Sequence, residues 1–209
     1  MFGYRPVAAM ALCVAFSPVW AQTGIERIES FLNEVGSLQA RFKQTLFDED
    51  LNRLEDSSGT MYLQRPGHFR WDYVSPYAQS IMSNGQTLWV YDSELSQVIV
   101  KHLDATAASS PSMLLTSDEP LETHFDVDEL PSEPGVVWVQ LTPKSQEVSF
   151  SVIRIAFAEA DLRTMELVDS FGQMTQINFL EVEKNTELDE AFFVMIVPEG
   201  VDFISDGQE

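Results

Sequence analysis

The sequence predicts a mainly β protein whose sheet is covered by a few short helices. Residues 59–101 contain short segments of alternating polarity, separated by turn residues, and residues 136–182 repeat that pattern. Helical character is confined to an amphipathic stretch near the N-terminus, a short apolar run after Pro111 and one turn at Asp189–Phe193. At 209 residues, the chain has the size of one domain with a substantial core.

The first 21 residues are expected to be a cleaved signal peptide that precedes the domain. Arg5 supplies a positive start, Val7–Val19 is mostly apolar, and Val19-Trp20-Ala21 has small enough residues where a signal peptidase reads. The apolar stretch is short for a transmembrane helix, and a retained N-terminal anchor is the alternative. Because Cys13 is the only cysteine, the remaining domain, residues 22–209, would contain neither disulfides nor thiolate sites.

The net charge is strongly negative, at −21 for the whole chain. Without the first 21 residues, 11 basic residues would face 33 acidic ones, for a net charge of −22. Binding to nucleic acid depends on lysine and arginine contacts with phosphates, and an anionic bilayer repels such a surface. We therefore expect neither as a partner. The acidity fits either a salt-rich habitat or a basic docking partner.

The N-terminal part of the domain predicts one helix followed by one strand. Apolar residues recur at helical spacing before Gly36, with Ile28, Phe31 and Leu32 among them, and polar residues fill the opposite side. From Leu38 to Leu46 the period changes to two, which is typical of a strand.

Asp48–Asp56 is expected to be an acidic loop. Asp48, Asp50 and Asn52 match the first three ligand positions of a calcium loop. Arg53, however, occupies the position that requires glycine, and Gly59 the position that requires glutamate. This favours a solvated turn over a metal site.

The central segment predicts an antiparallel meander with one aromatic face. Arg65-Pro66-Gly67 forces a turn, and along His68–Tyr73 the side chains of Phe69, Trp71 and Tyr73 share a face. Asn84-Gly85 is a strong two-residue hairpin signal between Ala78–Ser83 and Gln86–Tyr91. Further strands are expected at Gly59–Leu63, Gln97–Leu103, Val136–Leu141, Val148–Phe157, Arg163–Asp169, Met174–Val182 and Met195–Val197.

Two later segments leave alternatives open. The run Met113-Leu114-Leu115 after Pro111 suits one or two helical turns, which form either a lid over an apolar interior or a plug in the core. On a strand, His124, Asp126 and Asp128 would share a face and offer metal ligands, although such residues are more often a polar strand face.

No catalytic constellation emerges from the sequence. The three histidines fall on different expected strands, and there is neither a nucleophile elbow nor a phosphate-binding glycine loop. We therefore expect no enzymatic activity, cofactor or metal ion. The aromatic residues and methionines instead suit a cavity for flexible apolar chains, or an ordinary packed core.

The central segment resembles the outer-membrane lipoprotein carrier family, LolA. The matching pieces are Arg65-Pro66, Phe69-Arg70-Trp71, Ser83 to Trp89, Tyr91 through Gln97-Val98, and Ser110 to Leu115. Their order and spacing, after a signal peptide, cover most of the domain. Asn84 and Ser93 depart from the usual aspartate and proline, but they fit the same turns.

The resemblance implies an incomplete antiparallel β-barrel closed by short helices, which form a lid over a hydrophobic cavity. It implies a monomeric periplasmic chaperone that takes acylated lipoproteins from an inner-membrane ABC transporter and delivers them to an outer-membrane receptor lipoprotein. Arg65 would control lid closure and transfer. The acyl chains would contact Leu32, Phe69, Trp71, Ile81, Trp89, Met113, Leu114 and Leu115.

Two other functions remain open at this point. One is a periplasmic domain on the same fold that senses lipids or lipoproteins. The other is a secreted hydrolase that uses His124, Asp126 and Asp128.

Overall fold

The computed structural model describes residues 23–103, 111–145, 148–159 and 161–205. The expected signal peptide, residues 1–21, lies outside these residues. In chain order the elements are α1 (Gly24–Glu34), β1 (Ser37–Phe47), β2 (Arg53–Gln64), β3 (His68–Ser75), β4 (Gln79–Asn84), β5 (Thr87–Asp92), β6 (Gln97–His102), α2 (Pro111–Thr116), α3 (Leu121–His124), β7 (Phe125–Leu130), β8 (Val136–Pro143), β9 (Phe150–Ala158), β10 (Asp161–Asp169), β11 (Met174–Lys184), the 3₁₀ turn η1 (Glu190–Phe193) and β12 (Asp202–Ser205).

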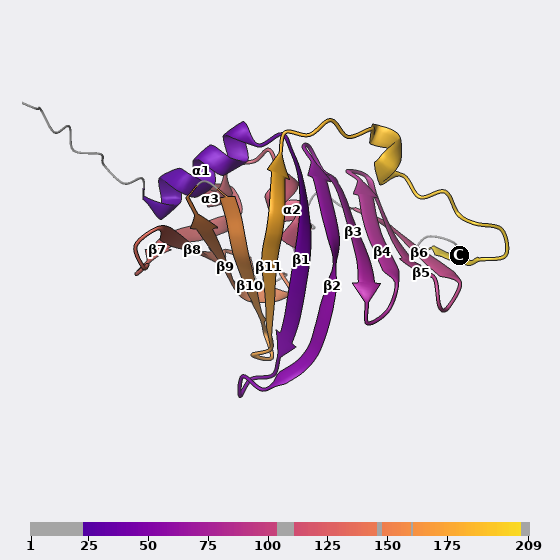
Figure 1. Cartoon of the computed structure of the whole chain (residues 1–209), viewed down its shortest axis with the longest axis horizontal. Helices are drawn as coiled ribbons and strands as arrows, with labels where there is room; N and C mark the ends of the chain where they lie inside the picture. Colours follow the sequence, from indigo (N-terminus) through magenta and orange to yellow (C-terminus); the bar gives the residue numbers. More distant parts are fainter. Residues whose placement is uncertain (1–22, 104–110, 146–147, 160, 206–209) are drawn as a thin grey trace, which may run out of the picture.

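The described strands form one curled sheet in the order β12-β6-β5-β4-β3-β2-β1-β11-β10-β9-β8-β7. Neighbouring strands are antiparallel except β12 and β6, which run parallel. Two meanders, β2–β6 and β7–β11, meet where β1 pairs with both β2 and β11. Figure 1 shows the sheet bending around α2 and α3. The predicted mainly β, curled architecture is confirmed.

Helix α1 covers one end of the sheet, where it packs on β7, β8 and β9. A capping box begins it: Thr23 Oγ1 accepts from the Glu26 N–H, and Glu26 accepts from the Thr23 N–H. Ile28 and Phe31 point into the core, as the helical spacing predicts. Among the described residues, no helix has the length and hydrophobicity needed to cross a bilayer.

The face of the sheet that carries Phe69 and Trp71, here called the inner face, holds the main core. Phe42 is its aromatic centre, with its ring 4.8 Å from the Trp71 ring and 5.0 Å from the Tyr73 ring, both edge-to-face. Gly59 lies beside them on β2. A Cβ there would stand 2.0 Å from the Asp72 carbonyl oxygen and 2.9 Å from Phe42 Cε1, so only glycine allows this close packing.

The opposite, outer face carries a second, smaller core beneath the C-terminal segment. After β11 this segment crosses to η1, beside β3 and β4, and ends as β12 on β6 (Figure 1). Phe193 of η1 is fully buried, as are Met82 and Val98 of the sheet, and all three lie outside the main core cluster.

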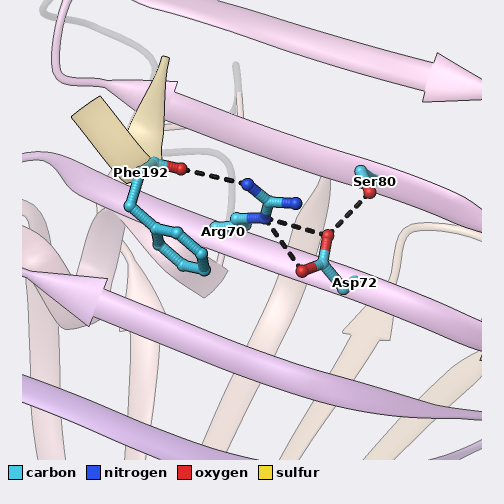
Figure 2. Close-up of polar contacts among 4 residues, drawn as sticks. All are labelled: Arg70, Asp72, Ser80 and Phe192. Carbon is cyan, nitrogen blue, oxygen red and sulfur yellow. Dashed lines mark hydrogen bonds and ion pairs between the residues drawn. The ribbon is translucent and has the colours of Figure 1, made fainter. Parts of the chain in front are cut away.

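Arg70 fastens η1 to this outer face. Its Nη1 donates to the Phe192 carbonyl oxygen at 3.1 Å, and its guanidinium lies 4.5 Å from the Phe192 ring centre. Asp72 accepts from Arg70 Nε at 2.8 Å and from the Ser80 hydroxyl at 2.6 Å, which fixes the guanidinium in place (Figure 2).

Three sequence predictions about the fold are wrong. The acidic loop is shorter than Asp48–Asp56, because Arg53–Asp56 already pairs with β1 as a polar, exposed start of β2. Met195–Val197 is not a strand; the last strand is Asp202–Ser205. The β4–β5 turn is centred on Gly85-Gln86 rather than Asn84-Gly85, since Ser83 pairs with Leu88.

Candidate functional site

An apolar cavity of about 390 Å³ lies on the inner face, between the β3–β5 strands and the β10–β11 strands. Its lining residues come from both halves of the sheet and from α2. They are Gln44, Phe69, Trp71, Tyr73, Ile81, Leu88, Lys101, His102, Leu103, Ser112, Phe150, Leu167, Thr175 and Ile177. Such a cavity, mostly apolar with a few polar groups in its lining, is suited to bind an apolar ligand.

Helix α2 closes one side of this cavity through a buried hydrogen bond. Trp71 Nε1 donates to the Ser112 hydroxyl oxygen at 2.8 Å, and both side chains are buried. Leu114 and Leu115 of the same helix are buried within the main core. A six-residue helix has little stability of its own, so these contacts hold it in place.

A second attachment lies where α2 ends, near the β2–β3 turn. The Gly67 N–H donates to the Thr116 carbonyl oxygen at 3.1 Å, and Arg65 Nη1 donates to the Ser117 carbonyl oxygen at 3.2 Å. Gly67 has a φ of +72°, as expected for the predicted turn. The turn therefore binds the carbonyl end of α2 through one backbone and one side-chain donor.

Arg65 is only partly satisfied in this position. Its Nε and Nη2 are buried without a hydrogen-bond partner in the described structure. Burial lowers the pKa of Arg65, and the nearby Asp118 carboxylate opposes that shift. The guanidinium nonetheless stays charged at neutral pH. The desolvation cost of these two donors offsets part of the stabilisation that Arg65 gains from its hydrogen bond to Ser117.

Six of the eight predicted cavity residues lie in or near the cavity wall or in α2. Phe69, Trp71 and Ile81 line the cavity. Leu114 and Leu115 pack in the core next to it. Met113 lies in α2, but its side chain is outside the described part of the structure.

Leu32 and Trp89 lie elsewhere than expected. Leu32 borders a separate polar depression that Arg65 and residues 117–122 also line. Trp89 pairs with Met82 and is on the outer face, because side chains alternate along β5 and Leu88 takes the inward position.

Several lining residues were not predicted from the sequence. Phe150, Leu167 and Ile177 belong to the C-terminal strands, where alternation marks an apolar face but does not show which strands it will oppose. Ser112 lies directly before the predicted lid run Met113-Leu114-Leu115, in a segment with several other serines, so the sequence did not single it out for the buried hydrogen bond to Trp71.

The three residues proposed for a metal site or a hydrolase do not lie on one strand: Asp126 and Asp128 are on β7, but His124 is not. His124 ends α3 and shares a hydrogen bond with Glu119, whereas Asp126 is on β7 and lies 3.7 Å from Lys144 Nζ. The described residues contain no cluster of three or more histidine, cysteine, aspartate or glutamate side chains suited to a metal. Asp48 instead accepts hydrogen bonds from the Asn52 side chain and backbone, which lower its pKa.

Comparisons with known proteins agree with this geometry. Residues 33–195 match the family model described as outer membrane lipoprotein carrier protein LolA. An outer-membrane lipoprotein carrier protein from Methylococcus capsulatus is 40% identical, over 93% of this chain and 94% of its own length. Its counterpart from Nitrosomonas europaea is 38% identical, over 96% and 97% respectively.

Solved structures show the same fold at low sequence identity. An uncharacterized conserved protein from Thermus thermophilus superposes with a TM-score of 0.55 at 15% identity, covering 87% of this chain and 96% of that one. A LolA superfamily protein from Nitrosomonas europaea gives 0.50 at 13% identity, over 84% and 99%. On the strength of the matched family model and the near full-length relatives, this chain belongs to the outer membrane lipoprotein carrier protein (LolA) family.

Proposed function

We propose that this protein is a periplasmic chaperone that accepts acylated lipoproteins released from the inner membrane and carries them to the outer membrane. The acyl chains occupy the cavity on the inner face, and no catalytic step is involved. The observation that carries the proposal is an apolar cavity, bordered by Trp71 and closed by α2, in a chain of the lipoprotein carrier family.

The free energy of acyl-chain burial explains why the cavity needs a lid. Each buried methylene contributes about 0.8 kcal/mol, so one chain of roughly sixteen carbons contributes on the order of 12 kcal/mol if it leaves water completely. A carrier that bound its cargo so tightly would not release it. Opening α2 breaks its contacts with Trp71, Gly67 and Arg65, and this cost lowers the net affinity.

The partners proposed are an inner-membrane ABC transporter that loads the carrier and an outer-membrane receptor lipoprotein that unloads it. The high net negative charge supports a basic docking surface on one of them. Charge reversal at exposed acids such as Asp50 and Glu119 should then slow association at low salt.

Arg65 is proposed to favour the closed, empty state. Its bond to the Ser117 carbonyl oxygen holds the chain just after α2 against the β2–β3 turn. Replacing it with leucine removes this hydrogen bond without adding a charge.

A release assay tests both statements. Spheroplasts that contain a labelled outer-membrane lipoprotein and this protein's own transporter are incubated with residues 22–209, and soluble lipoprotein is counted. We expect release in a one-to-one complex, and loss of onward transfer for Arg65→Leu, because the variant no longer favours the closed, empty state. Arg163→Leu, on an exposed site of β10, is the matched control. If the wild-type protein releases no lipoprotein, the carrier function is wrong.

A further inference from the structure

A second depression adjoins the cargo cavity on the inner face of the sheet. It has a volume of about 380 Å³ and is lined mainly by polar residues, with Glu55, Asp92 and Glu94 among them. Gln44 and Tyr73 line both spaces. These two side chains are therefore the partition between an apolar cavity and an acidic, solvent-facing one.

The partition is a single hydrogen-bonded pair. The Tyr73 hydroxyl donates to Gln44 Oε1 at 3.1 Å, joining β3 to β1 across β2. Gln44 lies in the middle of the sheet, paired with Ile177 of β11 on one side and Ser57 of β2 on the other. Its backbone position is therefore fixed by two neighbouring strands.

The Tyr73 ring is held equally firmly. It packs edge-to-face on Phe42 at 5.0 Å and stacks near Trp71 at 6.5 Å. Burial raises the pKa of Tyr73 to about 12, with the Glu55 carboxylate adding to the shift. The hydroxyl thus stays protonated, and able to donate, throughout the physiological pH range.

We infer that the Tyr73–Gln44 pair is the floor of the cargo cavity and sets the length of acyl chain that the protein prefers. This inference rests on the proposed carrier function. On the cavity side, a methylene meets aromatic and aliphatic carbon. Beyond the pair it meets carboxylates and water, so further chain length adds little to binding.

The energetic consequence is a break in the dependence of affinity on chain length, which means a chain length beyond which each added carbon strengthens binding much less. Each methylene that is buried above the floor strengthens binding by about fourfold, the equivalent of 0.8 kcal/mol. A chain that has reached the floor gains much less from further carbons. Shortening Tyr73 deepens the cavity and moves this break to longer chains.

The experiment measures binding of synthetic lipopeptides that carry one N-acyl chain of roughly 10 to 18 carbons, in which each added methylene would strengthen binding equally if the cavity had no floor. Displacement of a fluorescent naphthylamine from residues 22–209 reports the affinity. Tyr73→Ala is expected to move the break by roughly two to four carbons, the space left by the lost ring. Tyr77→Ala is the matched control, because Tyr77 lines only the acidic depression and is exposed.

Tyr73→Leu is a second variant that keeps bulk against Phe42 in case the alanine variant does not fold. It should show a smaller shift of the break in the same direction. If the wild type binds the lipopeptides and both Tyr73 variants keep its length profile, the floor is wrong while the carrier function stands. If the wild type binds none of them at any length, the carrier proposal fails and this inference fails with it.

Discussion

Ser112→Ala tests whether the buried hydrogen bond between Trp71 and Ser112 holds the lid shut. The substitution deletes the hydroxyl oxygen that accepts from Trp71 Nε1 at 2.8 Å. Alanine suits a helix and creates only a small void. The change therefore acts chiefly on this hydrogen bond.

The magnitude follows from the burial of both partners. In the closed state of the variant, the Trp71 indole N–H would be buried without an acceptor, which costs about 1–3 kcal/mol. In the open state the same N–H reaches water and carries no such cost. For a cost of about 2 kcal/mol, the ratio of closed to open lid falls about 30-fold.

Affinity for an apolar probe measures this ratio. When the binding-competent open state is rare, the apparent dissociation constant varies inversely with its population. We expect Ser112→Ala to bind a fluorescent acyl probe up to about 30-fold more tightly than the wild type, and to hand lipoprotein on more slowly. Ser151→Ala, an exposed serine on β9, is the control for loss of a hydroxyl.

A double-mutant cycle identifies the hydrogen bond as the cause. In a Trp71→Phe background the donor is already absent, so the further Ser112→Ala change should have little effect on probe affinity. Unchanged probe affinity in Ser112→Ala, together with a lower free energy of unfolding, would show that the bond stabilises the fold without controlling the lid. That result would refute the reasoning.

Three further predictions concern stability. Gly59→Ala should lower the free energy of unfolding by about 2–3 kcal/mol in urea titrations, because its Cβ has no room beside Asp72; a change below about 0.5 kcal/mol would contradict this. Phe193→Ala should lower the free energy of unfolding by about 3–5 kcal/mol. Phe171→Ala, at an 81% exposed residue, should lower it by less than about 0.5 kcal/mol. Equal losses of stability would argue against a second core. The raised pKa of Tyr73 means that the unfolded chain loses this proton first, near pH 10, so its contribution to stability falls as the pH rises from 10.0 to about 12. Alkaline denaturation curves should therefore be less steep over that range for Tyr73→Phe than for the wild type.

Local periodicity was enough to predict most of the fold. The helical spacing of Ile28 and Phe31 and the alternation of Phe69, Trp71 and Tyr73 each depend on neighbours in the chain, and the structure has them as expected. The register of the β4–β5 turn was missed by one residue, because the Asn84 side chain accepts from the Gln86 and Thr87 N–H groups and stands outside the turn centre.

The cavity was harder to predict from the sequence than the strands, because it depends on long-range packing. Ile177 and Phe69 share it only because β11 pairs with β1, which no local pattern encodes. The strand β12 was missed for a related reason. Its four residues are exposed, and it exists through parallel pairing with β6 rather than through its own pattern.

The strand order also dictates when the protein can finish folding. The two meanders, β2–β6 and β7–β11, consist of neighbours in the chain and can form as local units. The seam between them joins residues that are far apart, such as Ser37, whose hydroxyl donates to the Thr186 carbonyl oxygen 149 positions away. Pairing at such separation is slow, because the loop entropy must be overcome first.

Because the chain is synthesised from its N-terminus, β1 can gain its second partner only after β11 has been made. Until then, the edge of β1 and the inner faces of both halves are open to solvent and to other chains. The long-range pairing of β1 with β11, which creates a cavity between two half-sheets, thus also makes the nascent chain prone to aggregation.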